Sequence, residues 1–117
     1  GSIRIIDKLD FSKFLQHPKW IIGFSDTTVF HGKLSCLGIP SLHACMPFYF
    51  TNKTPEAKQS LFDALTGKVL HYEMPASPLN RPGRMEGKIV GGNLSVLYGM
   101  IGSDSFPEPE GKILFLE

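Results

Sequence analysis

The stretch Trp20-Ile21-Ile22-Gly23-Phe24-Ser25-Asp26-Thr27-Thr28 decides the fold of this chain. Its apolar first half predicts a buried strand over residues 20–24, and its polar second half begins a helical pattern over 26–37 that ends at Gly38. A further apolar run over 40–45 predicts a second strand. Strand, helix and strand in this order are typical of a parallel unit, which predicts the α/β fold class.

Ser25 follows the first of these strands and precedes the helix, which is where an α/β hydrolase places its nucleophile. At a helix N-terminus the hydroxyl would lie beside backbone N–H groups, which can stabilise an oxyanion. The Gly-x-Ser-x-Gly pattern of such turns is incomplete, because Thr27 replaces the second glycine. Taken alone, the segment favours the simpler alternative that Ser25 or Asp26 is only a helix cap.

A carboxylate follows the last strand that the sequence predicts, over residues 113–116. This residue, Glu117, could orient a histidine by accepting its ring N–H, as the acid of a serine hydrolase triad does. The alternative is a solvated surface charge, the usual state of a glutamate. No histidine has the spacing of a metal ligand or of a base, so we assign no role to His17, His31, His43 or His71. The missing base leads us to expect that the chain is a piece of a longer protein.

The pattern of the chain changes after residue 48. The pattern of residues 1–48 predicts a parallel α/β structure. Such a structure needs more strands and helices than 48 residues supply. The pattern of residues 49–117 predicts strands joined by short connections. We therefore expect parts of two domains, the C-terminal part of an α/β domain over 1–48 and a linker with the first part of another domain over 49–117. The further predicted elements are the end of a helix over 4–9, a short helix after Asp10, a helix over 54–65 that ends at Gly67, a strand over 69–74, a loop over 75–84, a strand over 87–90, a sharp turn at Gly91-Gly92, and a helix over 94–101 capped by Asn93.

Composition argues against several classes of function. The net charge is +1, from 12 Lys and Arg against 11 Asp and Glu, and no basic stripe is present, so we expect no nucleic-acid partner. No stretch approaches the about 20 apolar residues that cross a bilayer, so we expect no membrane partner. The two cysteines, Cys36 and Cys45, form neither a disulfide framework nor a metal-ligand pattern, which favours thiols in a reducing compartment.

Four segments, in this order along the chain, resemble the LD-carboxypeptidase family of serine peptidases, which includes muropeptide carboxypeptidases and microcin C self-immunity proteins. The first is similar to the end of the family's Gly-Gly-Tyr-Gly-x-x-Arg segment, the second to its nucleophile segment, and the last two to its later signatures. The segments are GSIR (1–4), PKWIIGFSDTT (18–28), GKIVGGNL (87–94) and ILFLE (113–117). One departure is HACM (43–46), where the family has His-Gly-Pro-Met. The resemblance covers the whole chain.

The resemblance implies the end of a parallel, Rossmann-like nucleophile domain followed by the start of a smaller, strand-rich C-terminal domain. It makes Ser25 the nucleophile, Glu117 the acid that orients the catalytic histidine, and the backbone N–H of Asp26 one oxyanion donor. Gly1 would lie near a second donor, and Asn93 near the substrate. The family's catalytic histidine lies beyond the glutamate, in sequence that this chain lacks, so the chain alone should be inactive. The resemblance implies no metal or other cofactor.

The activity that the resemblance implies is release of the terminal D-alanine from peptidoglycan-derived tetrapeptides (muropeptides) in cell-wall recycling, by a cytoplasmic homodimer. Two alternatives stay open. The same triad could cleave an acyl-sulfamoyl adenylate, which is the microcin C immunity reaction. The chain could also be part of a non-catalytic α/β ligand-binding domain, in which Ser25 is only a cap and Glu117 only a surface charge.

Overall fold

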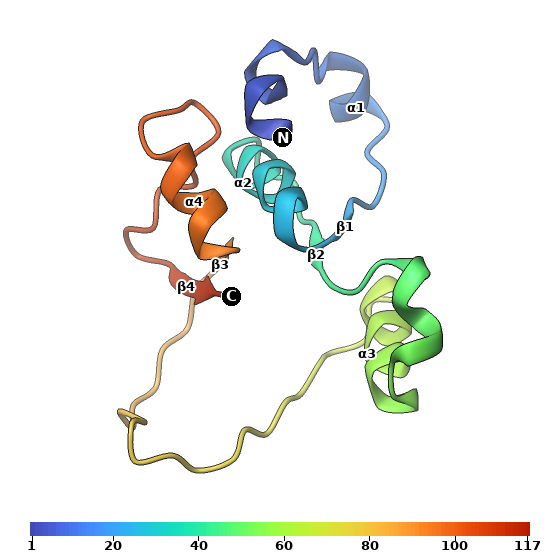
Figure 1. The fold of residues 1–117 in the computed structure, drawn as a ribbon, viewed down its shortest axis with the longest axis vertical. Coiled ribbons are helices and arrows are strands. Elements are labelled where there is room, and N and C mark those ends of the chain that lie inside the picture. The colour runs from blue at the N-terminus through green and yellow to red at the C-terminus, as the bar shows by residue number, and fades with distance from the viewer. The chain divides into compact units, whose positions relative to one another are not determined.

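The computed structural model describes residues 1–117 and contains two compact units (Figure 1). The first unit joins Gly1–Met46 to Glu86–Glu117, and the second is Pro47–Met85. Parallel strands joined by helices confirm the predicted α/β class. The predicted division into two domains at residue 48 stays a prediction.

The first unit contains the predicted strand, helix and strand. Its elements are β1 (Ile22–Gly23), a 3₁₀ turn (Ser25–Thr27), α2 (Thr28–Cys36) and β2 (Leu42–His43). The two strands are parallel, with Gly23 opposite His43. Both are shorter than predicted, because each has a single neighbour and only two residue pairs are in register. Gly38 follows the end of α2 with φ 75°, as predicted.

The segment before β1 consists of single turns. Two 3₁₀ turns, Ser2–Arg4 and Ile6–Lys8, replace the helix end that the sequence predicts over 4–9, and α1 (Ser12–Gln16) is the predicted short helix. Asp10 precedes α1 and accepts the Ser12 N–H at 2.8 Å. Turns of this kind satisfy their backbone groups locally.

A second parallel pair completes the first unit. Its elements are β3 (Ile89–Gly92), α4 (Leu94–Met100) and β4 (Ile113–Leu116). The sharp turn predicted at Gly91-Gly92 is wrong, because both glycines lie inside β3. Their φ angles of 133° and 137° suit only glycine, and a Cβ on Gly91 would lie 1.9 Å from the carbonyl oxygen of Phe115. Gly91 thus lets the backbone of β4 approach β3, whereas Gly92 lies against the Thr28 side chain of α2.

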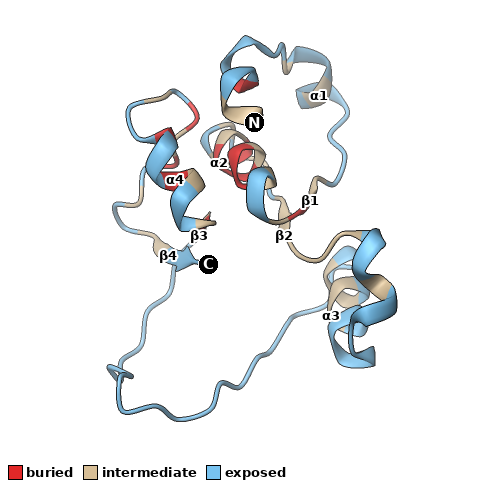
Figure 2. Cartoon of the chain, in the orientation of Figure 1, coloured by how far each residue is buried: buried red, intermediate tan, exposed pale blue.

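The two halves of the first unit share one apolar core. Ile6, Val29 and Met100 are fully buried, and Ile3, Phe11, Phe30, Val96 and Phe106 pack against them. Figure 2 shows buried residues on both α2 and α4. Gly32 permits this packing, because a Cβ there would lie 2.5 Å from both the Met100 methyl carbon and the Ser105 carbonyl oxygen. The core therefore fixes α2 against α4.

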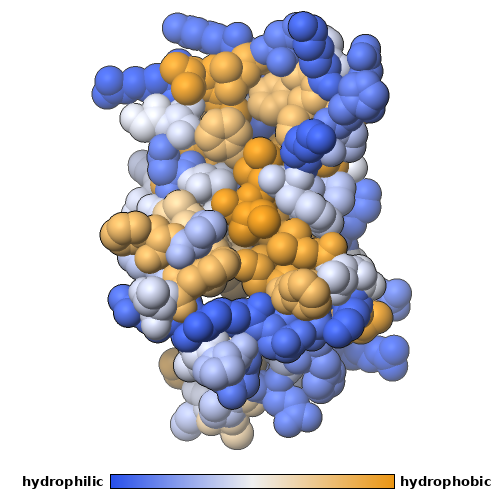
Figure 3. All heavy atoms as spheres, turned by 90° about the vertical axis from the view of Figure 1, so that its right-hand side faces the viewer, coloured by the Kyte–Doolittle hydropathy of each residue, from blue (hydrophilic) through white to orange (hydrophobic).

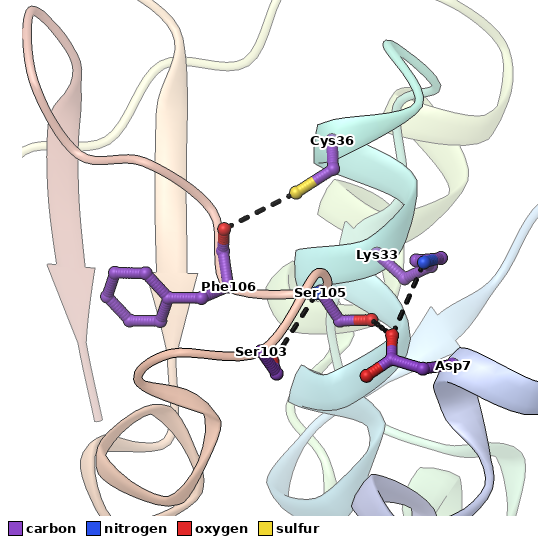
Figure 4. A network of polar contacts seen from close by, with 6 residues as sticks. All are labelled: Asp7, Lys33, Cys36, Ser103, Ser105 and Phe106. Atoms are coloured by element: carbon purple, nitrogen blue, oxygen red, sulfur yellow. Dashed lines mark hydrogen bonds and ion pairs between the residues drawn. The ribbon is translucent and has the colours of Figure 1, made fainter.

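A polar network ties the loop after α4 to α2 and to the N-terminal segment (Figure 4). The buried Ser105 hydroxyl donates to the Asp7 carboxylate at 2.5 Å, and Lys33 Nζ donates to the same oxygen at 3.3 Å. The Ser105 hydrogen bond is the main cause that lowers the pKa of Asp7. The Cys36 thiol donates to the Phe106 carbonyl oxygen at 3.4 Å. The network thus joins the two chain segments that make up the first unit.

The second unit is built on α3 (Pro55–Leu65), which follows a 3₁₀ helix (Pro47–Asn52). The prediction of this helix is confirmed: Thr54 caps it by accepting the Ala57 N–H at 3.3 Å, and Gly67 follows its end with φ 76°. The strand predicted over 69–74 is wrong, because this unit holds no second strand with which it could pair. No residue of the second unit is buried.

Large apolar side chains are exposed in both units. Figure 3 shows such side chains, in orange, among charged ones on the face that it presents. The most exposed are Val69, Leu79, Phe48 and Met74. Large apolar side chains exposed to solvent are often found where a protein contacts further protein. None of the helices combines the length and the apolar character that a bilayer-spanning segment needs.

Candidate active site

Ser25 has an unusual backbone conformation. It lies two residues after the end of β1 and has φ 56°, the only positive φ at a non-glycine residue of this chain. The left-handed conformation costs a residue with a Cβ about 1 kcal/mol. Gly23 makes the tight turn possible, because a Cβ there would lie 2.6 Å from the Thr27 hydroxyl oxygen. A strained serine at a strand-to-helix turn is the geometry of a nucleophile elbow.

The Ser25 side chain is exposed and makes no hydrogen bond with the chain. Neither the 3₁₀ turn that begins at Ser25 nor α2 has a side-chain cap. The alternative that Ser25 or Asp26 serves as a helix cap is therefore wrong. A hydroxyl without a structural partner is free to meet a base and a substrate.

The Asp26 carboxylate binds the N-terminal segment. It accepts the Ser2 hydroxyl at 2.6 Å and the Ser2 N–H at 3.0 Å, and these hydrogen bonds lower the pKa of Asp26. Gly1 packs so closely that a Cβ there would lie 2.7 Å from Oδ1 of Asp26. The two segments predicted to supply oxyanion donors therefore touch. The role of their N–H groups stays a prediction.

Glu117 follows β4 and is held through its backbone. Its N–H donates to the Gly92 carbonyl oxygen at 2.9 Å, and its own carbonyl oxygen accepts the Leu94 N–H at 3.0 Å. Its side chain is 43% exposed, and Oε2 lies 3.4 Å from Nε2 of His43. A carboxylate that has an imidazole neighbour and is still open on one side has the chemistry of a triad acid.

Asn93 begins α4 beside α2. Its side-chain oxygen accepts the Val96 N–H at 3.2 Å, which confirms the predicted cap. Its backbone N–H donates to the Thr28 hydroxyl oxygen at 3.0 Å. The cap uses only the oxygen of the side-chain amide, so the NH₂ group can still donate to a ligand. The predicted substrate-binding role of Asn93 stays a prediction.

One histidine without a predicted role supports the turn before Ser25. His31, on α2, is buried, with Nε2 3.0 Å from the Gly23 carbonyl oxygen and Nδ1 2.8 Å from Oγ of Ser41. A carbonyl only accepts, so Nε2 carries the proton and the Ser41 hydroxyl donates to Nδ1. Burial lowers the pKa of His31, which favours this neutral ring. His31 thus joins α2 to β1 and to the residue that precedes β2.

The second unit holds an open pocket of about 560 Å³ between α3 and residues 69–72. Its polar lining comes from Glu56, Gln59, Ser60, Asp63, His71 and Tyr72. None of the predicted site residues lines it. No group of three or more His, Cys, Asp or Glu side chains is placed to hold a metal ion. The candidate site is therefore the set of residues around Ser25 and Glu117 in the first unit.

Known proteins match both ends of this chain. The profile of the LD-carboxypeptidase N-terminal domain matches residues 1–44, and that of the LD-carboxypeptidase C-terminal domain matches residues 86–117. The chain is 33% identical to a probable murein peptide carboxypeptidase of Bacillus subtilis (strain 168) and 29% identical to the microcin C7 self-immunity protein MccF of Escherichia coli. These matches include 100% of this chain but only 39% and 44% of the relatives.

A solved structure shows the same arrangement. Muramoyltetrapeptide carboxypeptidase from Oxalobacter formigenes matches with a TM-score of 0.77 and 28% sequence identity, over 97% of this chain and 40% of that chain. The chain therefore spans about two fifths of the length of the proteins that it matches.

Replacing Ser25 by Gly should raise the free energy of unfolding by about 1 kcal/mol, because glycine adopts the left-handed conformation without the Cβ penalty. Ser25→Ala keeps the Cβ and should stay close to the wild type. Urea unfolding followed by circular dichroism measures both. The matched control is Ser95→Gly on the exposed side of α4, which should lose about 0.5–1 kcal/mol. A Ser25→Gly variant as unstable as this control would show that the turn is not strained.

Acid should destabilise the first unit through His31. Its folded-state pKa lies below the unfolded value of about 6.5, so the unfolded chain binds the proton more readily. The contribution of His31 to stability is therefore complete above pH 6.5, and it is lost as the pH falls through the folded-state pKa. His31→Gln should flatten the pH dependence of the unfolding free energy below about pH 6.5, whereas His17→Gln, an exposed control, should not. If the unfolding free energy of the wild type and of His31→Gln depended on pH in the same way, His31 would not be the source of the acid sensitivity.

Proposed function

Because this chain belongs to the LD-carboxypeptidase family, we propose that it carries the nucleophile and the acid of a serine peptidase. The observation that carries the proposal is Ser25, whose strained backbone presents a hydroxyl without a structural partner in the turn that precedes α2. Strain at a position that contributes nothing to helix capping is typical of a functional residue. The comparisons support a carboxypeptidase, and the serine mechanism is our proposal.

In the proposed mechanism, the Ser25 oxygen attacks the scissile carbonyl carbon while its proton passes to a histidine that Glu117 orients. The backbone N–H of Asp26, with a second donor near Gly1, stabilises the oxyanion. Collapse of the tetrahedral intermediate breaks the C–N bond, and the histidine returns the proton to the departing amine. Water, activated by the same histidine, then hydrolyses the acyl-enzyme and restores Ser25. Because this histidine lies outside residues 1–117 in our proposal, the chain alone should not turn over substrate.

The proposed substrate is a peptidoglycan-derived tetrapeptide, from which the enzyme releases the terminal D-alanine in cell-wall recycling. The support is the Bacillus subtilis relative, a probable murein peptide carboxypeptidase, and the solved muramoyltetrapeptide carboxypeptidase. Asn93 would then contact the substrate through its side-chain NH₂, which the cap of α4 leaves free to donate.

A second candidate is hydrolysis of an acyl-sulfamoyl adenylate. The match to the microcin C7 self-immunity protein, which also includes the whole of this chain, favours it specifically. Both reactions attack an acyl carbon, so the same nucleophile and acid would serve either one. The third hypothesis, a ligand-binding domain without catalysis, does not explain why Ser25 has a strained backbone conformation.

We further propose that the protein is a homodimer in the cytoplasm, as the family resemblance implies. The exposed apolar side chains are compatible with a protein interface. Sedimentation velocity of the natural protein that contains this chain should give twice the mass of one chain at micromolar concentration. A monomer at that concentration would refute the dimer and leave the proposed chemistry intact.

The proposed chemistry is tested in the natural protein that contains this chain. Ser25→Ala should lower kcat for D-alanine release by at least about 10⁴-fold, and Glu117→Gln by about 10²–10⁴-fold, because both act on the transition state. Ser95→Ala, a serine on the exposed side of α4, is the control. The assay compares a murein tetrapeptide with an acyl-sulfamoyl adenylate, and the larger kcat/KM identifies the substrate class. Full activity of Ser25→Ala on both would rule out the serine mechanism.

A further inference from the structure

Glu117 has one ring neighbour that the proposed mechanism does not use. His43 ends β2, and its Nε2 lies 3.4 Å from Oε2 of Glu117. The imidazole ring is fixed from two sides, since it packs against the Phe115 ring at 5.0 Å and the His31 ring at 5.7 Å between centroids. β2 and β4 belong to different sheets, so this contact joins the two sheets of the first unit at the proposed acid.

The surroundings of His43 decide which ring nitrogen carries the proton. Nδ1 is buried and has no hydrogen-bond partner. A proton on Nδ1 would leave a buried donor unsatisfied and turn the lone pair of Nε2 toward a carboxylate, which is repulsive. The tautomer with the proton on Nε2 avoids both costs, because the proton is then on the nitrogen that lies 3.4 Å from Oε2 of Glu117. The ring is therefore placed as a donor to the carboxylate.

We propose that His43 is a positioning residue, which holds the Glu117 carboxylate in the orientation that the triad histidine needs. The Glu117 side chain is 43% exposed, and a carboxylate so open to solvent rotates unless a donor fixes it. A donor on Oε2 leaves Oε1 to accept the N–H of the triad base. The inference rests on the proposed function and deepens it, because it names the residue through which β2 supports the acid.

The test compares two substitutions of similar length in the natural protein that contains this chain. His43→Gln keeps an N–H donor near the position of Nε2, whereas His43→Met has none. His43→Met should lower kcat for D-alanine release by about 10-fold or more and leave KM unchanged, because the proposed contact orients the acid and its base and not the substrate. His43→Gln should recover most of kcat. Thermal unfolding of both variants shows whether they fold equally well.

Each outcome has a definite meaning. Equal kcat in His43→Met and the wild type overturns the proposal. Equal loss in His43→Met and His43→Gln also overturns it, because His43 would then act as a base or as a packing residue. If Ser25→Ala keeps its activity, the proposed function itself fails. An inactive Ser25→Ala beside a fully active His43→Met means that the inference about His43 fails alone.

A second measurement does not depend on catalysis or on the stability of the His43 variants. Nitrogen-15 NMR of histidine-labelled protein should show the Nε2–H tautomer for His43, and Glu117→Gln should shift its Nε2 resonance. Glu110→Gln, at an exposed position, should leave that resonance unchanged. An Nδ1–H tautomer, or a resonance that ignores Glu117→Gln, contradicts the hydrogen bond that the proposal requires.

Discussion

The first unit depends on the close approach of α2 to β3. Thr28, at the start of α2, is fully buried, and its hydroxyl oxygen accepts the Asn93 N–H at 3.0 Å. A Cβ on Gly92 would lie 2.6 Å from the same oxygen, so the strand can lie this near the helix only because it carries glycine there. The contact joins residues 65 apart in the sequence. It connects the segment that presents Ser25 with the pair of strands that presents Glu117.

The carboxylates of Asp26 and Glu117 have different surroundings, which suit them to different roles. The Asp26 carboxylate is occupied by two hydrogen bonds from Ser2, which lower its pKa and tie the N-terminal segment to the turn. The Glu117 carboxylate has only the long contact with His43 and is still partly open to solvent. The first is thus a structural anion, and the second remains available for chemistry. Ser25 combines both properties in one residue. Its backbone is constrained in the left-handed conformation, while its side-chain hydroxyl makes no hydrogen bond within the chain.

Local signals predict the helices well and the long-range contacts poorly. Thr54 and Gly67 bracket α3 as expected, because a cap and a left-handed glycine need only their own turn. The strand expected over 69–74 does not form, because a strand depends on a partner that local sequence does not reveal. Gly91 and Gly92 signal a special backbone, but whether this is a turn or a close strand depends on the position of β4. The pairing of His43 with Glu117 likewise depends on strands far apart in the chain.

The central claim is that Ser25 and Glu117 belong to one triad. The most direct measurement is a crystal structure of the natural protein that contains this chain, with the distances from Oγ of Ser25 to the nearest histidine nitrogen and from the other nitrogen of that ring to Glu117. Our account predicts about 2.6–3.2 Å for both distances. It also predicts that the triad histidine bonds Oε1 of Glu117 and that Oε2 remains beside His43. It is contradicted if no histidine lies between the two residues, or if the ring beside Ser25 makes its second hydrogen bond to a group other than Glu117.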